Sequence, residues 1–311
     1  MKIQEHVPLK EKNWFHVGGD ARYYCEPQSV EDFKEAFQFS KNKNIPFFIL
    51  GEGANIVISD DGFDGLVIHP KNNNMSFTEN NNVCDVTVGA GASMHNLIEY
   101  TLDNNILGLE IFSNIPGTIG GSVYINLHYF EALISQILTK ATVIHVTTGE
   151  VITVDNRWFE FGYDQSKLME KEYILIDATL QLKKGTDTEI AYARGRRFEI
   201  TRHRTSRYPK AYTCGSFFRN FSDDEVSFMW EGKKMKFVAF YLDKIGVKGV
   251  EFVGGACVSS QHANMIINKS NATASDIVQL ARILQQKVKD AFDVIPQPEC
   301  IFVGFKEYPL L

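Results

Sequence analysis

The chain has 311 residues, of which 44% are hydrophobic and 23% are charged, and its formal net charge at pH 7 is −6. This composition is typical of a globular protein large enough for two or three domains, and the acidic balance argues against general nucleic-acid binding. The chain has no apolar run long enough for a membrane span and no signal-peptide core, and its five cysteines are scattered without a Cys-x-x-Cys pair, so we expect a reduced cytoplasmic protein without a membrane segment or a metal site.

The start of the chain predicts a small α/β unit. A short strand is expected over residues 21–25, followed by a helix that begins at Ser29, where Asp32 completes a capping box. Residues 46–50 read as a buried strand, which ends at a glycine-rich loop over residues 51–55 with the sequence Gly-Glu-Gly-Ala-Asn.

The middle of the chain mixes strands and helices without regular alternation. An asparagine-rich loop over residues 71–75 is a plausible boundary, and it is followed by a strand over residues 83–88 and a helix over residues 93–104. Residues 141–154 predict a hairpin and residues 173–182 a further strand. This order favours an α+β fold over a doubly wound sheet.

A second glycine-rich segment lies between these elements, at residues 115–126, with the sequence Ile-Pro-Gly-Thr-Ile-Gly-Gly-Ser-Val-Tyr-Ile-Asn. Glycine lets a backbone or a ligand approach closely, and the N–H groups of Gly120 and Gly121 are candidates to receive an anion. Together with residues 51–55, this segment suggests a cofactor that carries phosphates. The alternative is that both segments are only tight turns between core strands.

The last third contains one strongly basic run, residues 194–210, in an otherwise acidic protein. It is either a solvated helix face or a site that grips a phosphorylated or carboxylated ligand, because arginine matches such groups bidentately. The clearest helix of the chain is expected over residues 273–292, with Thr273 and Asp276 at its start.

Five motifs follow one another along the chain: Gly-Glu-Gly-Ala-Asn at 51–55, Ile-Pro-Gly-Thr-Ile-Gly-Gly at 115–121, Phe-Gly-Tyr at 161–163, Gly-Ser-Phe-Phe-Arg-Asn at 215–220 and Gln-Pro-Glu at 297–299. In this order they resemble one family, the UDP-N-acetylenolpyruvoylglucosamine reductases (MurB), over nearly the whole chain. The segment between residues 182 and 202 is short, as in the subtype of that family that lacks an extra substrate-covering loop.

The resemblance implies a two-part FAD-binding region of the vanillyl-alcohol-oxidase (PCMH) type, over residues 1–70 and 71–200, and a substrate-binding C-terminal domain over residues 201–311. It implies a bound FAD that NADPH reduces and that passes hydride to the enolpyruvyl double bond of a UDP-sugar, giving UDP-N-acetylmuramate for peptidoglycan synthesis, and so a role in cell-wall biogenesis, cell shape and cell division. The loop at 51–55 has no His or Cys, so a covalent flavin link from it is not suggested. The sequence indicates no partner beyond this small molecule and leaves the oligomeric state open.

The resemblance also carries site residues over to this chain. Ser216 matches the proton donor and Glu299 the acidic residue near the enolpyruvyl group; by themselves they read as a turn serine and a surface carboxylate. The positions that match substrate contacts are Arg207, Asn220, Lys248 and His262. The positions that match the cofactor site are Gly51, Glu52, Gly53, Ala54, Asn55, Ile115, Pro116, Gly117, Gly120, Gly121 and Asn126.

Two positions depart from the family pattern at the reacting end. The family has an arginine after Phe-Gly-Tyr, but this chain has Asp164, whose charge would repel a substrate carboxylate. Asp164 could be protonated, could point away, or could be replaced by Arg157 or Lys167. Bulky residues at 127–130, including His128, also stand where the family has small ones. The alternatives are therefore a flavoprotein with a changed substrate, or an FAD-binding homologue without turnover.

Overall fold

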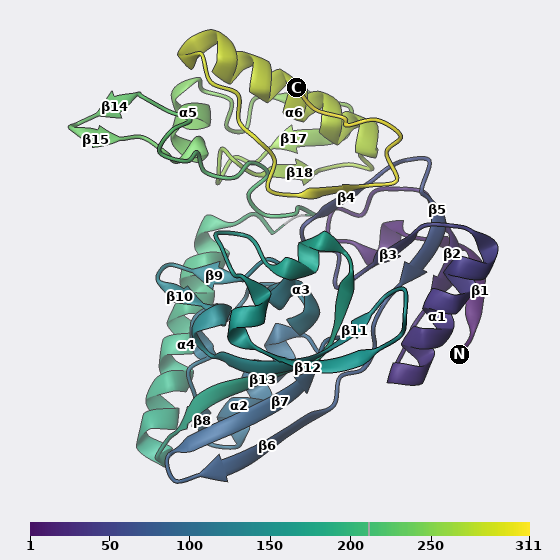
Figure 1. The fold of residues 1–311 in the computed structure, drawn as a ribbon. Helices are drawn as coiled ribbons and strands as arrows, with labels where there is room; N and C mark the ends of the chain where they lie inside the picture. The colour runs from purple at the N-terminus through teal and green to yellow at the C-terminus, as the bar shows by residue number, and fades with distance from the viewer. Residues whose placement is uncertain (211) are drawn as a thin grey trace. The chain divides into compact units, whose positions relative to one another are not determined.

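The computed structural model describes residues 1–210 and 212–311 (Figure 1). The chain forms two compact units, and each is assembled from separate stretches of sequence. The first unit contains Met1–Gln4, Tyr23–Glu52 and Gly65–Arg204, and the second contains Glu5–Arg22, Gly53–Asp64 and Thr205–Leu311. The three-part division at residues 70 and 200 stays a prediction.

The largest sheet of the first unit is antiparallel, with the strand order β12-β11-β13-β7-β6. The short strand β8 also pairs with β13. The predicted hairpin at 141–154 is confirmed by the pairing of β11 with β12. The bounds are β6 Met75–Asn80, β7 Val83–Gly89, β8 Ile106–Leu107, β11 Leu138–His145, β12 Val151–Asp155 and β13 Tyr173–Lys184.

The strands β11 and β13 of this sheet are buried on both faces, because they alternate apolar side chains between two cores. On one face, Val86 and Val88 of β7 belong to the same core as the helices α2 (Met94–Asp103) and α3 (Ile119–Tyr124). On the other face, Ile144 and Ile174 pack into the core that contains Phe33 of helix α1 (Val30–Lys43). The capping box predicted at the start of α1 is confirmed.

A smaller sheet has the strand order β1-β2-β5-β3. Its strands β1, β2 and β5 each contain residues assigned to the first unit and residues assigned to the second. Its pair β3–β5 is parallel, which accounts for the continuous apolar run from Leu66 to Ile68. The bounds are β1 Ile3–Pro8, β2 Asp20–Cys25, β3 Phe47–Ile49 and β5 Phe63–Ile68. The remaining short elements of the first unit are β9 His128–Tyr129, β10 Ala132–Leu133, η2 Glu110–Phe112, η3 Ile134–Gln136, η4 Asn156–Phe159 and η5 Lys167–Glu170.

The second unit is organised around helix α6 (Ala274–Phe292), whose predicted capping box of Thr273 and Asp276 is confirmed. Asp60 adds two hydrogen bonds at the same end, since its carboxylate accepts from the N–H groups of Ala274 and Ser275 at 2.7 and 2.9 Å. The apolar face of α6 packs on the sheet β16-β17-β18 and on α5. The bounds are η1 Lys10–Lys12, β4 Ile56–Ile58, β14 Met229–Trp230, β15 Lys233–Lys234, α5 Val238–Lys244, β16 Phe252–Val253, β17 Ala256–Val258, β18 Ile266–Asn268 and β19 Ile301–Val303.

The two longest helices of the described chain are α4 (Asp187–Arg207) and α6. Helix α4 is mostly polar and buries only Ile190 and Ala193. Among the described residues, no helix is both long and apolar enough to cross a membrane.

Candidate active site

The two glycine-rich segments meet in the first unit, although more than sixty residues separate them in the sequence. The N–H group of Gly117 donates to the carboxylate of Glu52 at 2.9 Å. Gly51 lies so close to Thr118 that a Cβ at Gly51 would be 2.8 Å from the Thr118 hydroxyl oxygen. No atom of the described chain lies within 4 Å of the place where a Gly117 Cβ would be. Residues 51–52 and 117–118 therefore form a narrow backbone site, which we call the cradle. Only glycine fits at position 51 of this cradle.

Some backbone N–H groups at this cradle already donate hydrogen bonds within the protein, and others do not. The expectation that Gly120 and Gly121 offer free N–H groups was wrong. The N–H groups of Gly120 and Gly121 were expected to receive an anion, but they donate to Ala90 O at 2.8 Å and Thr118 Oγ1 at 3.1 Å, because α3 begins here. The N–H groups of Gly51 and Glu52 donate to no described residue. The open backbone donors of the first unit's cradle therefore lie in the loop at 51–52 rather than in α3.

Asn55 carries an unsatisfied acceptor in the second unit. Its side-chain amide donates to Glu299 O at 3.3 Å, while its Oδ1 is buried and accepts no hydrogen bond from the described residues. An unsatisfied buried acceptor costs about 1–3 kcal/mol, so a ligand that brings a donor here would recover that cost. Gly53 in the same loop has φ +67° and no room for a Cβ, which would lie 2.6 Å from Asn13 Cα.

Asn126, predicted to contact the cofactor, holds two loops together in the first unit. It is buried, its Nδ2 donates to Gly162 O at 2.9 Å, and its Oδ1 accepts from Ser135 N at 3.2 Å. Ser166 Oγ adds a bond to Tyr124 O at 2.7 Å. These bonds fix the turn at 162–165 against the end of α3. Nearby, Ile115 packs against the core of the sheet, and its N–H donates to Phe112 O, while Pro116 is half-buried.

Asp164 has a different partner from the two cations considered from the sequence. It sits in that turn with φ +52°, and its Oδ1 is 3.2 Å from His128 Nδ1. Lys167 instead pairs with Glu160 at 2.8 Å, and Arg157 is exposed. The structure thus brings together the two positions that depart from the family pattern, Asp164 and His128.

In the second unit, Ser216 and Glu299 lie on neighbouring segments that pair as strands. Phe218 bridges to Pro298, and the N–H group of Glu299 donates to Phe217 O at 2.8 Å. Phe217 and Phe218 are fully buried, while Ser216 is half-buried and Glu299 is exposed. The pairing therefore holds the segments that carry the two predicted catalytic residues of this unit next to each other, with Glu299 opposite Phe217.

Asn264 is a residue that the sequence reasoning missed. Its Oδ1 accepts from Phe218 N at 3.0 Å, its Nδ2 donates to Phe218 O at 2.7 Å, and it is 4% exposed. This buried amide fixes the segment that carries Ser216. No local sequence pattern predicts this role of Asn264, because the role depends on a contact with a residue more than forty positions away.

Two predicted substrate contacts, Arg207 and Lys248, act electrostatically on a third, His262. Burial lowers the pKa of His262 from its usual value, and the positive charges of Arg207 and Lys248 lower this pKa further, while Asp243 opposes them. The ring of Tyr208 stacks on His262 with the centroids 6.0 Å apart, and Lys248 Nζ is 3.1 Å from Asp243 Oδ1. The positive charges of Arg207 and Lys248 that act on His262 are suited to an anionic ligand.

Asn220, the fourth predicted contact, has a structural role in the described chain. Its Oδ1 accepts from Val238 N at 3.4 Å, at the start of α5, and its C=O accepts from Arg219 at 3.0 Å. Its contact with substrate stays a prediction.

The basic run on α4 separates into two parts. Four of its arginines pair with carboxylates, which favours the solvated helix face for this part. Arg204 differs, because its guanidinium lies 5.1 Å from the centre of the Tyr129 ring and donates to Asn114 O at 3.2 Å. The pairs are Arg194–Asp103, Arg196–Glu110, Arg197–Glu99 and Arg202–Glu199.

The Arg219–Glu225 pair predicts a pH-dependent contribution to stability. Arg219 donates to both carboxylate oxygens, at 2.8 and 2.6 Å, and this bonding lowers the pKa of Glu225 from 4.5 to about 2. A lowered folded-state pKa stabilises the fold above the unfolded-state pKa, and the contribution is lost as the pH falls from about 4.5 to about 2. We expect Arg219→Gln to lower the urea midpoint at pH 7, with the difference from the unmodified protein closing near pH 2.

Urea unfolding followed by circular dichroism at several pH values measures this difference. Arg202→Gln is the matched control, because Arg202 pairs with Glu199 on an exposed helix face and exposed pairs contribute little. A pH-independent deficit in Arg219→Gln would contradict the ionic explanation.

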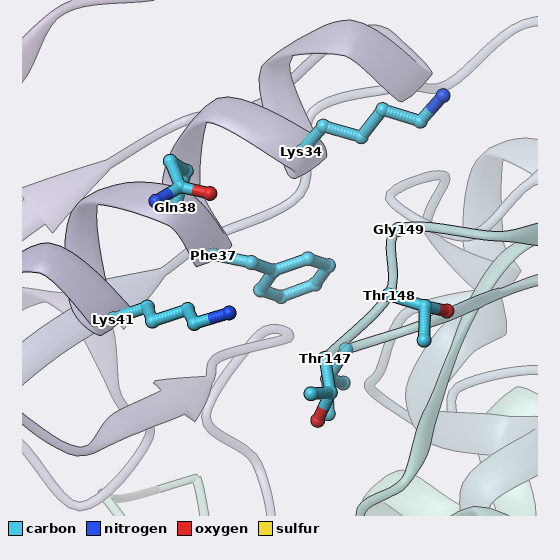
Figure 2. Close-up of a pocket in the computed structure, with 8 residues that line it drawn as sticks. Lys34, Phe37, Gln38, Lys41, Thr147, Thr148 and Gly149 are labelled. Carbon is cyan, nitrogen blue, oxygen red and sulfur yellow. The ribbon is translucent and has the colours of Figure 1, made fainter.

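Two hollows of the first unit involve none of the predicted site residues. One, of about 200 Å³, lies between α1 and the turn that joins β11 to β12; Figure 2 shows Phe37 directed toward Thr147, Thr148 and Gly149, with Lys34 and Lys41 beside it. The other, of about 410 Å³, lies between β8, η2 and α4. These hollows carry no part of the candidate active site.

Comparison with known proteins covers both regions of the chain. The family model for an FAD binding domain matches residues 21–155, and the model for the UDP-N-acetylenolpyruvoylglucosamine reductase C-terminal domain matches residues 207–303. The UDP-N-acetylenolpyruvoylglucosamine reductase of Clostridium perfringens strain SM101 is 32% identical over 298 residues, which are 96% of this chain and 91% of the relative. That of Clostridium tetani is 32% identical over 97% of this chain and 92% of the relative.

A solved structure resembles the whole chain as well. The crystal structure of UDP-N-acetylenolpyruvylglucosamine reductase (MurB) from Thermus caldophilus matches with a TM-score of 0.76 and 26% identity, covering 97% of this chain and 99% of that one. The similarity in sequence and in fold thus extends over both units.

Proposed function

Because this chain belongs to the UDP-N-acetylenolpyruvoylglucosamine reductase family, we propose that it reduces the enolpyruvyl double bond of UDP-N-acetylenolpyruvoylglucosamine with NADPH. The family resemblance read from the five motifs is confirmed, and so is an FAD-binding domain followed by the family's C-terminal domain. Its family membership therefore makes the protein a flavin-dependent oxidoreductase of peptidoglycan synthesis. The identity of its substrate and its use of NADPH form the proposal.

The first unit's cradle fits an FAD that is held without a covalent bond. Supporting observations are the open amides of Gly51 and Glu52 and the space at Gly117. When bound, FAD supplies hydride transfer between NADPH and the substrate. The amides of Gly51 and Glu52 would bind its phosphates.

The chemistry assigned to the chain's own residues is proton transfer and positioning. Reduction adds hydride to one alkene carbon and a proton to the other, which lies next to the substrate's carboxylate. We assign the proton to Ser216 Oγ, whose weak acidity suffices because an enolate-like carbon is a strong base in a site shielded from water. Glu299 is assigned to the same end of the substrate, and its backbone bond to Phe217 supports this placement.

Binding of the UDP group is assigned to the cluster around His262. Arg207 and Lys248 bring positive charge to the half-buried His262, and a diphosphate would be bound by these charges. The chain's cysteines are all free thiols, which fits the cytoplasm as the proposed place of action.

The observation that carries the proposal is the pairing of the segment that contains Ser216 with the segment that contains Glu299. The test is an anaerobic stopped-flow experiment with the FAD-loaded protein. We expect NADPH to bleach the flavin and UDP-N-acetylenolpyruvoylglucosamine then to restore its absorbance. If the flavin stays reduced with this compound, the chain is a flavoprotein with a changed substrate or a homologue without turnover.

A further inference from the structure

We propose that the hollow between α1 and the turn from β11 to β12 binds a small, doubly charged phosphate, either inorganic phosphate or a short phosphomonoester. We call it the lysine hollow; it is lined by Lys34, Phe37, Gln38, Lys41 and residues 146–149. All of these residues lie in the first unit, and none of them is assigned to the cofactor or to the UDP-sugar. The lysine hollow is therefore a site additional to the reductase chemistry.

The lining of the lysine hollow carries only positive charge. It contains two lysines, Lys34 and Lys41, and no acidic residue, so its formal charge is +2, whereas the net charge of the whole chain is −6. Neither ammonium group has an ion pair, a hydrogen bond or a ring contact with another described residue. Lys167 of the same unit, by contrast, pairs with Glu160 at 2.8 Å. Two unpaired cations around one hollow attract an anion, and they favour a dianion over a single charge.

The two lysines lie on one face of α1. They are seven positions apart, which is close to two helical turns, so their Cα atoms are about 10 Å apart along the axis. Figure 2 shows Lys41 extending toward the ring of Phe37. Lys34 lies at the other end, with its Cγ 3.6 Å from the place where a Gly149 Cβ would be. Because lysine side chains are long and flexible, both ammonium groups can reach one anion that lies over Phe37 and Gln38.

The turn residues form a fixed wall opposite α1. The N–H groups of Thr147 and Thr148 both donate to His145 Nδ1 at 3.2 Å, which holds the turn in one conformation. Phe37 of α1 and Val146 before the turn pack in the same core, so the two walls are held together. The hydroxyl group of Thr147 has no partner among the described residues. It is available to donate to a phosphate oxygen.

The size of the lysine hollow restricts the ligand. Its volume of about 200 Å³ is below the range of about 300–1,000 Å³ that is usual for sites of drug-sized ligands and cofactors. It therefore has room for a phosphate group with a few further atoms, but not for a UDP-sugar or a dinucleotide. A phosphate also fits the charge, because a phosphoryl group carries about −1.5 to −2 at pH 7 and has three strong acceptor oxygens. A single carboxylate would neutralise only one of the two lysines.

Equilibrium dialysis of the FAD-loaded protein against radiolabelled inorganic phosphate, at constant ionic strength, tests this site. We expect saturable binding to the unmodified protein. The double variant Lys34→Gln with Lys41→Gln should bind at least about tenfold more weakly, because two charge-assisted contacts are lost. Lys140→Gln is the matched control, because Lys140 is an exposed lysine of the same unit that does not line the hollow, and its Kd should equal that of the unmodified protein.

Lys248→Gln separates the lysine hollow from the cluster around His262, to which the diphosphate of the UDP group is assigned. If Lys248→Gln loses phosphate binding and the double variant retains it, the phosphate belongs to that cluster and the inference is overturned. It is also overturned if the unmodified protein binds no phosphate, or if the double variant binds it equally well. Competition by glycerol 3-phosphate distinguishes the two sources of the ligand. Displacement at a lower concentration than with unlabelled phosphate assigns the hollow to a phosphomonoester, and displacement at an equal or higher concentration assigns it to inorganic phosphate.

Discussion

Replacing Ser216 with alanine is expected to slow substrate-dependent reoxidation of the reduced enzyme by about 100- to 10,000-fold, the range in which a positioned proton donor contributes. The hydroxyl is the proposed source of the proton, and the methyl group of alanine has none to give. Phe217 and Phe218 are buried and Asn264 bonds Phe218, so the backbone at position 216 should keep its place. Reduction of the flavin by NADPH should proceed at the unmodified rate.

Stopped-flow absorbance measures the two half-reactions separately in the same sample. Ser227→Ala is the control, because Ser227 is an exposed serine of the same unit, and it should match the unmodified protein in both half-reactions. An equal slowing of both half-reactions in Ser216→Ala would point to a disturbed flavin site. Unchanged reoxidation would remove Ser216 from the proposed chemistry.

Replacing Gly51 with valine is expected to yield a protein that purifies nearly without FAD. The first added carbon would already lie 2.8 Å from the Thr118 hydroxyl oxygen, and the branched methyl groups would crowd the loop further. The open N–H groups of Gly51 and Glu52, which we assign to the phosphates, would move away with the loop. The phosphates of FAD are charged, so losing the N–H groups that bind them should weaken FAD binding strongly. The flavin-to-protein absorbance ratio of the purified protein should therefore fall at least about tenfold.

Gly195→Ala is the matched control for this variant. Gly195 lies in helix α4 of the same unit, and a Cβ there would meet no atom within 4 Å, so this protein should retain FAD at the unmodified ratio. Circular dichroism checks that both variants are folded. A folded Gly51→Val protein with full FAD content would exclude the cradle as the cofactor site.

Local chemistry in the sequence was sufficient to predict several elements. The capping boxes of Ser29 with Asp32 and of Thr273 with Asp276 are confirmed, because such caps are decided within four residues. The hairpin at 141–154 is confirmed for the same reason, since its turn chemistry and alternation are local. The order of the five motifs identified the family, which the comparisons confirm.

Long-range contacts decided what the sequence left open. Gly120 and Gly121 looked like bare turn residues, but they lie in the first turn of α3, where the N–H group of Gly121 donates to Thr118 Oγ1 and that of Gly120 donates to Ala90 O, thirty positions away. The pairing of Asp164 with His128 depends on Asn126, whose two clamping bonds reach residues nine and thirty-six positions away. Periodicity and composition contain no signal for such contacts.

The parallel pairing of β4 with β19 has a consequence for synthesis on the ribosome. β4 contains Ile56 and β19 contains Ile301, so the partner strand emerges roughly 240 residues later, which takes roughly 10 to 50 s at usual elongation rates. During that interval β4 has an unpaired edge and the apolar side chain of Val57 lacks its core. The second unit therefore stays incomplete until β19 has been synthesised, and a truncated product that ends before β19 would leave an unpaired strand edge exposed to chaperones and proteases.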